Sequence, residues 1–353
     1  MPGFGEQLER LEAIVRKLEA EDLDLDEALK LFEEGVERLR AAREQLTQAE
    51  VRSRRRSRVK AQAVSAYLAD ARARVDAVLE VWTERGDEVI RYSLLGEGKR
   101  LRPTLVFAAH EALGGSGKEG VAELAAAVEV VHAYSLVHDD LPCMDDDDLR
   151  RGRPTAHRAF DVPRATRAGY QMVALAARVL AHGLDALGLS DGRRRQIALE
   201  LFRAAGAGGM IGGQALDLEA EAKTLPMDQL AEVHRRKTGA LIAASCVIGG
   251  LAAGEDAPQG HVEALREYGQ AIGLAFQIAD DVLDATATSD QLGKTAGKDA
   301  ARAKATFVTL LGVGTARAEA ERLSAQAVDQ LRHAGLVSPT LVELAHYIVT
   351  RPN

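Results

Sequence analysis

The 353-residue chain contains little cysteine, few aromatic side chains and no long apolar run. Its two cysteines, Cys143 and Cys246, cannot build a disulfide framework and fit no zinc-site spacing, so we expect a reducing, cytoplasmic location. Seven phenylalanines, six tyrosines and one tryptophan leave the core mainly to aliphatic side chains. The longest apolar run, residues 241–253, is shorter than the roughly 20 residues of a membrane-spanning helix, which predicts a buried helix and no transmembrane segment.

The net charge of −8 is unevenly distributed along the chain. Residues 1–50 contain 14 acidic and seven basic residues, whereas residues 51–60 contain six basic residues and no acidic one. This change in composition predicts a small domain at 1–50, a basic linker at 51–60 and a large domain at 61–353. Two alternatives for the basic segment are the end of a helix and a nucleic-acid contact, although it lacks aromatic residues for base stacking.

Apolar residues recur at intervals of three or four in both halves of the small domain, on either side of an acidic turn at 21–26. This spacing predicts two amphipathic helices that form a coiled-coil-like hairpin. Two helices of this length bury too little surface to be stable alone, so we expect a partner. The simpler alternative is a coiled coil that only dimerises the chain. The residues with this spacing are Leu8, Leu11, Val15, Leu18, Leu29, Phe32, Val36, Leu39 and Leu46.

Three stretches of the small domain identify a resemblance. They are LEAIVRKLE at 11–19, DLDLDEAL at 22–29 and FEEGV at 32–36. In these stretches the segment resembles the small subunit of bacterial exodeoxyribonuclease VII over nearly its whole length. The resemblance implies a non-catalytic part that binds the large subunit of that nuclease through its helices and meets DNA only indirectly.

The large domain reads as helical throughout, because Ala, Leu, Glu and Arg dominate and strand patterns are scarce. The predicted fold class is therefore all-α, with the N-terminal helical hairpin followed by a helical bundle. Two predicted helices, 121–141 and 263–283, are apolar on most sides and should lie at the centre of the bundle.

Both central helices end in carboxylates. Clustered carboxylates repel one another unless cations join them, and hard oxygen ligands favour Mg²⁺ with phosphates or waters as its remaining ligands. A solvated acidic helix end would explain one such cluster but explains two less well. The predicted metal ligands are Asp139, Asp140 and Asp145 in the first cluster and Asp280, Asp281 and Asp284 in the second.

Basic residues occur close to both clusters. Forked arginine and point-charge lysine side chains are suited to diphosphate oxygens. The sequence thus predicts one anion bridged to the acids by metal and a second anion held by arginine and lysine. The candidates are Lys99 and Arg102 after a glycine turn, Arg150 and Arg151 after the first cluster, and Lys237, Lys294, Lys298 and Lys304 around the second.

Five motifs follow one another in the large domain. They are GKRLRP at 98–103, DDLPCMDDDDLRRGRPT at 139–155, GGQALD at 212–217, KTG at 237–239 and FQIADDVLD at 276–284. Through them, residues 61–353 resemble the trans-isoprenyl diphosphate synthases. The resemblance implies an isoprenoid-synthase bundle, a homodimer, and head-to-tail condensation of isopentenyl diphosphate with dimethylallyl or geranyl diphosphate.

The resemblance also implies individual roles. Three Mg²⁺ ions would bridge the allylic diphosphate to the two aspartate clusters, with Arg150, Lys237, Lys294 and Lys304 adding positive charge. Isopentenyl diphosphate would bind Lys99, Arg102, His132 and Arg151, although His132 could equally be a hydrogen-bonded core histidine. Thr238 and Gln277 would direct oxygen dipoles at the allylic cation. The catalytic set is then Arg150, Lys237, Thr238 and Gln277.

Product length in this family depends on the residues one turn before the first aspartates. Here these are Tyr134 and Ser135, and the ring of Tyr134 should stop growth at farnesyl diphosphate. Geranylgeranyl diphosphate is the alternative product. Two positions depart from the family pattern: Tyr170 replaces a common aspartate, and Glu97 replaces a glycine beside the expected isopentenyl diphosphate site.

Two further functions compete with this interpretation. One is an interaction protein in which the hairpin acts and the synthase domain is inactive, which the intact aspartate motifs argue against. The other is a head-to-head synthase or terpene cyclase, which would not need a second diphosphate site built from Lys99, Arg102 and His132.

Overall fold

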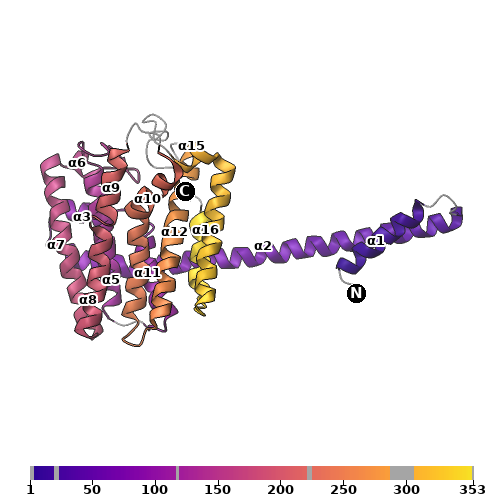
Figure 1. Cartoon of the computed structure of the whole chain (residues 1–353), viewed down its shortest axis with the longest axis horizontal. Helices are drawn as coiled ribbons and strands as arrows, with labels where there is room; N and C mark the ends of the chain where they lie inside the picture. Colours follow the sequence, from indigo (N-terminus) through magenta and orange to yellow (C-terminus); the bar gives the residue numbers. More distant parts are fainter. Residues whose placement is uncertain (1–3, 20–23, 117–118, 221–224, 287–305, 352–353) are drawn as a thin grey trace. The chain divides into compact units, whose positions relative to one another are not determined.

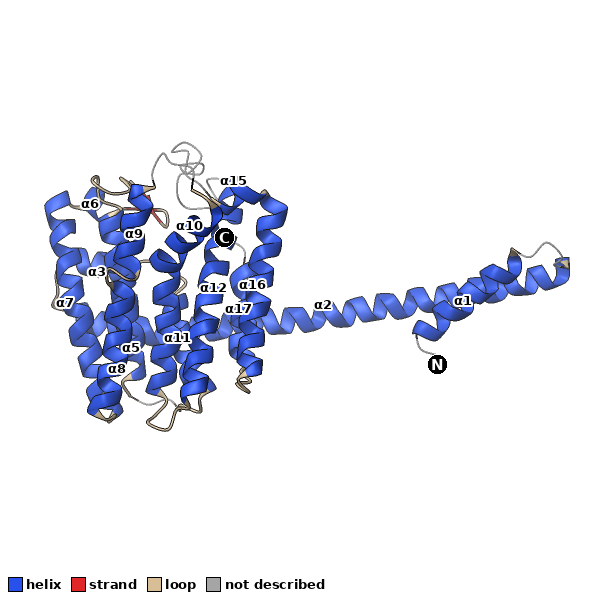
Figure 2. Ribbon diagram, in the orientation of Figure 1, coloured by secondary structure: helices blue, strands red, loops and turns tan. Residues whose placement is uncertain are grey.

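The computed structural model describes residues 4–19, 24–116, 119–220, 225–286 and 306–351. The chain divides into two compact units, residues 1–63 and 64–353, which are considered separately below. Almost all of the described chain is helical, and the predicted all-α class is confirmed (Figure 2).

The first unit contains α1 (Phe4–Leu18) and the first part of α2 (Leu25–Thr83), which pair as the predicted hairpin (Figure 1). Ile14 on α1 and Leu31 on α2 are buried between the two helices. Arg10 holds the helices together from the side, with its Nε 3.0 Å from Oε1 of Glu34. This ion pair is exposed to solvent, which screens it, so it adds little to stability.

Most of the predicted apolar stripe of the hairpin remains in contact with solvent. Phe32 and Leu39 are each 61% exposed. The hairpin alone therefore buries only part of its apolar surface, as expected for a segment that needs a partner. The exposed members of the stripe are Val15, Leu18, Leu29, Phe32, Leu39 and Leu46.

Residues 51–60, the predicted basic linker, are helical and lie within α2. The helix that begins in the hairpin therefore continues through this segment and ends at Thr83. A helical linker is compatible with the predicted domain assignment, which stays a prediction.

The second unit is a bundle of helices with one small β-hairpin, β1 (Leu149–Arg150) and β2 (Arg153–Pro154), paired antiparallel. After the end of α2 its helices are α3 (Glu88–Leu94), α4 (Leu101–Ala112), α5 (Val121–Asp139), α6 (Ala156–Ala159), α7 (Val162–Leu187), α8 (Asp191–Ala205), α9 (Met210–Glu219), α10 (Met227–His234), the π-helix η1 (Arg235–Gly239), α11 (Ala240–Ala252), α12 (Gln259–Thr286), α15 (Phe307–Leu311), α16 (Val313–His333) and α17 (Pro339–Thr350).

The apolar helices lie at the centre of this bundle, as predicted. α5 packs against α4, α7 and α11, while α11 packs against α4, α8 and α12. Every residue of α11 from Leu241 to Ala252 is buried. Among the described residues only α5 is long and apolar enough to cross a membrane, and most of it is buried within the bundle, as in the core helix of a globular protein.

Close packing of α11 against α4 generates a prediction about stability. A Cβ at Gly249 would overlap the backbone carbonyl oxygen of Val106, whereas Gly314, on α16, has open space at the same position. Gly249→Ala should therefore lower the free energy of unfolding by about 2 kcal/mol. Gly314→Ala should leave it unchanged or slightly raised, because alanine favours helix. Urea unfolding of both variants checks this, and equal effects would contradict the packing argument.

Candidate active site

The two predicted aspartate clusters lie at the C-terminal ends of two helices. Asp139 is the last residue of α5, and Asp280, Asp281 and Asp284 lie in the last turns of α12. The elements that follow α5 and α12 in the chain, including α6 and α15, lie at the same end of the bundle, the upper end in Figure 1.

In the first cluster, Asp140 is buried and paired with Arg150 of β1. Nε of Arg150 is 3.1 Å from Oδ1 of Asp140, and its Nη2 lies 3.2 Å from Oδ2 of Asp147. Burial raises the pKa of the Asp140 carboxyl, and the positive charge of Arg150 opposes this rise. Arg150 thus neutralises the acids that the sequence places next to it.

Asp139 is less well compensated. Burial raises its pKa to about 7, a rise that Lys237 opposes and Asp145 reinforces. Lys237 lies in the π-helix η1, a local irregularity that is frequent at functional sites. Its Nζ is 2.7 Å from Oδ2 of Asp217 and 4.0 Å from Oδ2 of Asp145. One lysine is therefore shared among several carboxylates, which leaves negative charge at Asp139 in need of a further cation.

In the second cluster, protein groups contact Asp280 and Asp281. Asp280 pairs with Arg351, whose guanidinium also lies 4.2 Å above the ring of Phe276. Asp281 accepts a hydrogen bond from the backbone N–H of Phe307 at 2.9 Å and a longer one from Nε2 of Gln277 at 3.4 Å. Asp284 is partly buried on the same helix.

A cavity of about 280 Å³ begins at Asp139 and Lys237 and extends along α5. Tyr134 and Ser135 both line it, as do Arg102 and His132 from the basic side. The apolar part of its wall is formed by Leu136, Met144, Met210, Ile211, Ala215 and Leu218.

One hydrogen-bonded pair and one group of three aromatic rings lie at or near the cavity wall. Thr238 lines the cavity and donates from its hydroxyl to Oε1 of Gln277 at 3.0 Å, so both oxygens lie in one hydrogen-bonded pair. On the other side, the ring of His138 packs edge-on between Tyr134 and Tyr170, with centroid distances of 5.0 and 5.1 Å. The unusual Tyr170 is thus linked through His138 to the residue expected to limit product length.

The four residues expected to bind isopentenyl diphosphate come from three elements. Lys99 and Arg102 lie at the start of α4, His132 lies on α5, and Arg151 lies at the tip of the β-hairpin. Arg151 and Gly152 both have positive φ, 55° and 74°, which is the geometry of a two-residue type I′ turn.

Positive charge accumulates among these four residues. Burial lowers the pKa of Lys99, and it lowers that of Arg102 to about 10. Burial also lowers the pKa of His132 well below its ordinary value, with Arg102 and Arg151 adding to the effect, so His132 is neutral. Nε of Arg102 is buried with no hydrogen-bond partner among the described residues. A bound anion would satisfy this donor and relieve the repulsion.

Glu97 affects this site less than its sequence suggested. Its backbone φ is not positive, so its peptide conformation does not require the usual glycine. Its carbonyl oxygen accepts a hydrogen bond from Nη1 of Arg151 at 2.7 Å, and its side chain is exposed. The acid therefore stands at the edge of the basic group, where solvent screens its charge.

The carboxylates fit a magnesium site completed by substrate. In the described part of the chain, no three His, Cys, Asp or Glu side chains come close enough to enclose a metal ion by themselves. Mg²⁺ in phosphate-transfer sites is held by one or two carboxylates, with phosphate oxygens and waters as the other ligands. The hard oxygens and the uncompensated charge at Asp139 suit such an ion.

Some of these relationships could not be read from the sequence, and some predictions remain outside the structure. Asp217 lies within the quoted GGQALD motif, but nothing there indicates that it binds Lys237. Arg351 follows α17 with no local motif, and only the fold brings it to Asp280. Lys294, Lys298 and Lys304 lie outside the described residues.

Comparison with known proteins identifies both parts of the chain. Residues 83–337 match the family model for polyprenyl synthetase, and residues 4–53 match that for the exonuclease VII small subunit. The chain is 45% identical to farnesyl diphosphate synthase of Escherichia coli over 267 residues, covering 75% of this chain and 88% of that protein. It is 43% identical over 272 residues to the large subunit 1 of the heterodimeric geranylgeranyl pyrophosphate synthase of Arabidopsis thaliana, covering 75% and 72%.

Solved structures agree with this assignment. An FPP/GFPP synthase from Zymomonas mobilis superimposes with a TM-score of 0.71 at 34% identity, covering 82% of this chain and all of that one. A geranyltransferase from Helicobacter pylori, solved with magnesium and isoprenyl diphosphate, superimposes with a TM-score of 0.69 at 30% identity, covering 80% and 95%. The chain therefore belongs to the polyprenyl synthetase family of prenyltransferases and carries an exonuclease VII small-subunit domain before its synthase domain.

Proposed function

We propose that this prenyltransferase condenses isopentenyl diphosphate with dimethylallyl or geranyl diphosphate, in a Mg²⁺-dependent reaction, to give farnesyl diphosphate. One observation supports this most strongly: a single cavity has Asp139 and Lys237 on one side and Arg102 and His132 on the other. Two diphosphates with different binding requirements can thus be held next to one apolar channel. Because both diphosphate substrates are soluble in water, we propose that the enzyme acts in the cytoplasm.

On the acidic side, Asp139, Asp145 and Asp280 would hold three magnesium ions against the allylic diphosphate, with Asp140, Asp281 and Asp284 in support. When bound, the metal withdraws electrons from the diphosphate and makes it a better leaving group. Lys237 and Arg150 add positive charge on the same side, and Lys294 and Lys304 are proposed to do so as well. Ionisation breaks the allylic C–O bond, and its electron pair leaves with the diphosphate.

On the basic side, Lys99, Arg102, His132 and Arg151 hold isopentenyl diphosphate without metal. Its double bond attacks the allylic cation to form the new C–C bond, and a proton is then lost to the departing diphosphate. Thr238 and Gln277 direct their oxygens toward the cation. Because His132 is neutral, it donates a hydrogen bond to the diphosphate and does not serve as the acid.

The residues on the α5 wall of the cavity favour a fifteen-carbon product. Tyr134 and Ser135 line the cavity on the α5 side, and the ring of Tyr134 is braced by His138. We propose that this ring stops the growing chain at farnesyl diphosphate. Geranylgeranyl diphosphate is the second candidate, because geranylgeranyl synthases are among the similar proteins.

The synthase domain is proposed to form a homodimer through α7 and α8. Large apolar side chains are exposed on both helices, with Tyr170 68% exposed. A second copy would remove this surface from water. The exposed residues are Val162, Tyr170 and Val173 on α7, and Leu199 and Phe202 on α8.

The hairpin is proposed to bind the exodeoxyribonuclease VII large subunit through its exposed apolar stripe and to meet DNA only indirectly. The stripe lies within residues 1–50, a strongly acidic segment that contains 14 acidic and seven basic residues. A partner with an apolar helical surface and a basic rim would fit it. Residues 51–60 would then be the joint between the two functional parts.

The proposed activity is tested by incubating the purified chain with Mg²⁺, labelled isopentenyl diphosphate and geranyl diphosphate. Chromatography of the dephosphorylated product should show farnesol, and chelation of the metal should abolish its formation. Absence of any prenyl product in the presence of Mg²⁺ would contradict the proposal.

Tyr134→Ala should lengthen the product, because it removes the ring expected to close the cavity. Products of twenty carbons or more should replace most of the fifteen-carbon product. Tyr134→Phe is the matched control, since it keeps the ring and should keep the product length. An unchanged product from Tyr134→Ala would show that another residue limits growth.

Asp139→Asn should alter how stability depends on pH in the metal-free protein. The Asp139 pKa is about 7 in the fold against an ordinary value of 3.8, so the folded state keeps a proton that the unfolded state releases. Stability is therefore lost as the pH rises from about 4 to about 7. The asparagine variant should escape this loss and gain about 4 kcal/mol relative to the unchanged protein over that range. Urea unfolding in EDTA measures it, and a pH-independent difference would refute the assignment.

Phe32→Asp combined with Leu39→Asp should weaken capture of the nuclease large subunit at least about tenfold, because it places charge in the centre of the apolar stripe. Arg40→Ala, an exposed change beside the stripe, is the control and should bind normally. Pull-down with purified large subunit provides the measurement. Equal binding by all three proteins would exclude the stripe as the contact surface.

A further inference from the structure

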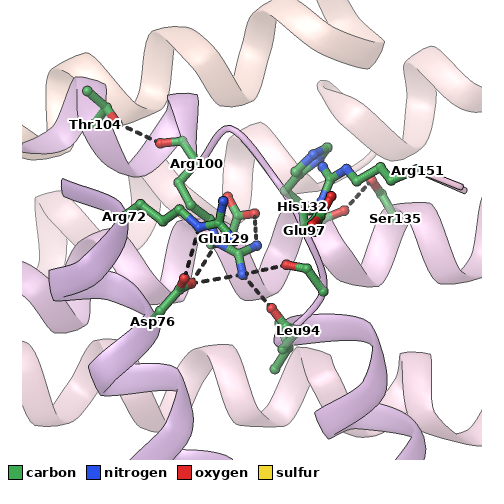
Figure 3. Close-up of polar contacts among 11 residues, drawn as sticks. Arg72, Asp76, Leu94, Glu97, Arg100, Thr104, Glu129, His132, Ser135 and Arg151 are labelled. Carbon is green, nitrogen blue, oxygen red and sulfur yellow. Dashed lines mark hydrogen bonds and ion pairs between the residues drawn. The ribbon is translucent and has the colours of Figure 1, made fainter. Parts of the chain in front are cut away.

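Arg100 lies between two residues of the basic group, Lys99 and Arg102, but its guanidinium is directed at Asp76, Glu129 and the carbonyl oxygen of Leu94 (Figure 3). Its side chain is only 1% exposed. We propose that Arg100, together with Asp76 and Glu129, is a positioning residue that fixes the basic group for isopentenyl diphosphate. This inference rests on the proposed function and adds to it a part of the chain that touches neither substrate.

The guanidinium of Arg100 joins three elements of the fold. Its Nε is 2.9 Å from Oδ1 of Asp76 on α2, and its Nη1 is 2.8 Å from Oε1 of Glu129 on α5. Its Nη2 donates to the carbonyl oxygens of Leu94 at 2.6 Å and Gly96 at 3.3 Å, which lie at the end of α3 and in the following loop (Figure 3). One side chain thus ties the loop before α4 to two helices.

The backbone of Arg100 is held just as firmly. Its φ of 46° and ψ of 38° place it in the left-handed region, which residues other than glycine rarely adopt. Its carbonyl oxygen accepts hydrogen bonds from the backbone N–H of Thr104 at 3.0 Å and from the Thr104 hydroxyl at 2.8 Å. Such a conformation persists when the surroundings over-determine it, and it is common where a functional geometry depends on it.

Glu129 connects this anchor to the rest of the basic group. It lies on α5 three residues before His132, so the two side chains leave the same face of the helix one turn apart. Its second carboxylate oxygen is buried without a hydrogen-bond partner among the described residues. The charge of Glu129 also favours the protonated forms of Arg102 and Arg151, which raises their pKa against burial. Glu129 therefore offsets repulsion among cations that must stay together before substrate arrives.

The position of the anchor predicts a selective effect. In the loop between α3 and α4, the carbonyl oxygen of Glu97 accepts a hydrogen bond from Nη1 of Arg151. A shift of this loop would therefore move Lys99, Arg102 and Arg151, three of the four basic residues. Among the described residues, the side-chain hydrogen bonds of Arg100 go to Asp76, Glu129, Leu94 and Gly96, and none goes to Asp139 or Lys237 on the acidic side of the cavity. Loss of the anchor should therefore weaken isopentenyl diphosphate binding and leave the allylic site intact.

The test compares the binding of two ligands to three full-length proteins by calorimetry. The ligands are isopentenyl diphosphate and a non-hydrolysable allylic thiolodiphosphate with Mg²⁺. Arg100→Lys keeps the charge but loses the forked geometry, and it should bind isopentenyl diphosphate about tenfold more weakly, with unchanged affinity for the allylic analogue. Arg72→Gln is the matched control, because Arg72 binds the other oxygen of Asp76 at 3.2 Å from a more exposed position. It should bind both ligands normally.

Glu129→Gln is a second variant that keeps the side-chain shape and should show the same selective loss. Thermal unfolding of each protein separates this effect from general destabilisation, which would weaken both ligands together. Equal affinity of Arg100→Lys and the unchanged protein for isopentenyl diphosphate would overturn the positioning role while leaving the proposed function in place. Failure of the unchanged protein to bind isopentenyl diphosphate would overturn both.

Discussion

Carboxylates at the ends of α5 and α12 are removed from much of the surrounding water, and a buried carboxylate stays ionised only beside a cation. The fold supplies Arg150 for Asp140 and Arg351 for Asp280. At Asp139 the compensation is incomplete, because Lys237 also serves Asp217, and burial raises the Asp139 pKa to about 7. The site is therefore arranged to accept additional positive charge, which the proposed metal–diphosphate complex would bring.

The opposite constraint governs the basic side, where cations gather and an anion is needed. α5 carries residues of both sides, since His132 and Asp139 are seven residues apart and thus separated by about 10 Å along one helix axis. Tyr134 lies between them in the sequence and lines the cavity. A single apolar core helix, α5, can in this way set the spacing of two diphosphates and form one wall of the product channel. The burial of α5 thus fixes the geometry of the proposed site.

Local patterns in the sequence predicted much of this architecture. Helical periodicity marked α5, α11 and α12, and the aspartate and basic motifs marked the charged residues that line the cavity, among them Arg102, Asp139 and Lys237. Contacts that depend on packing between distant segments were not predictable. Arg351 binds Asp280, which lies 71 positions away in the sequence. In the sequence Arg100 is one more basic residue of its motif, and only the fold shows that its side chain is buried. The continuous α2 also runs through the charge change at 51–60, because composition marks a boundary between domains without deciding whether the backbone stays helical there.

In the proposed mechanism, one cavity binds two diphosphates by different means, one through metal and carboxylates and one through fixed cations. The metal dependence of each binding step measures this directly. Calorimetric titration in EDTA should show isopentenyl diphosphate binding with nearly its full affinity, whereas a non-reactive allylic diphosphate analogue should bind only after Mg²⁺ is added. Equal dependence of both ligands on Mg²⁺ would contradict the separation of the two sites.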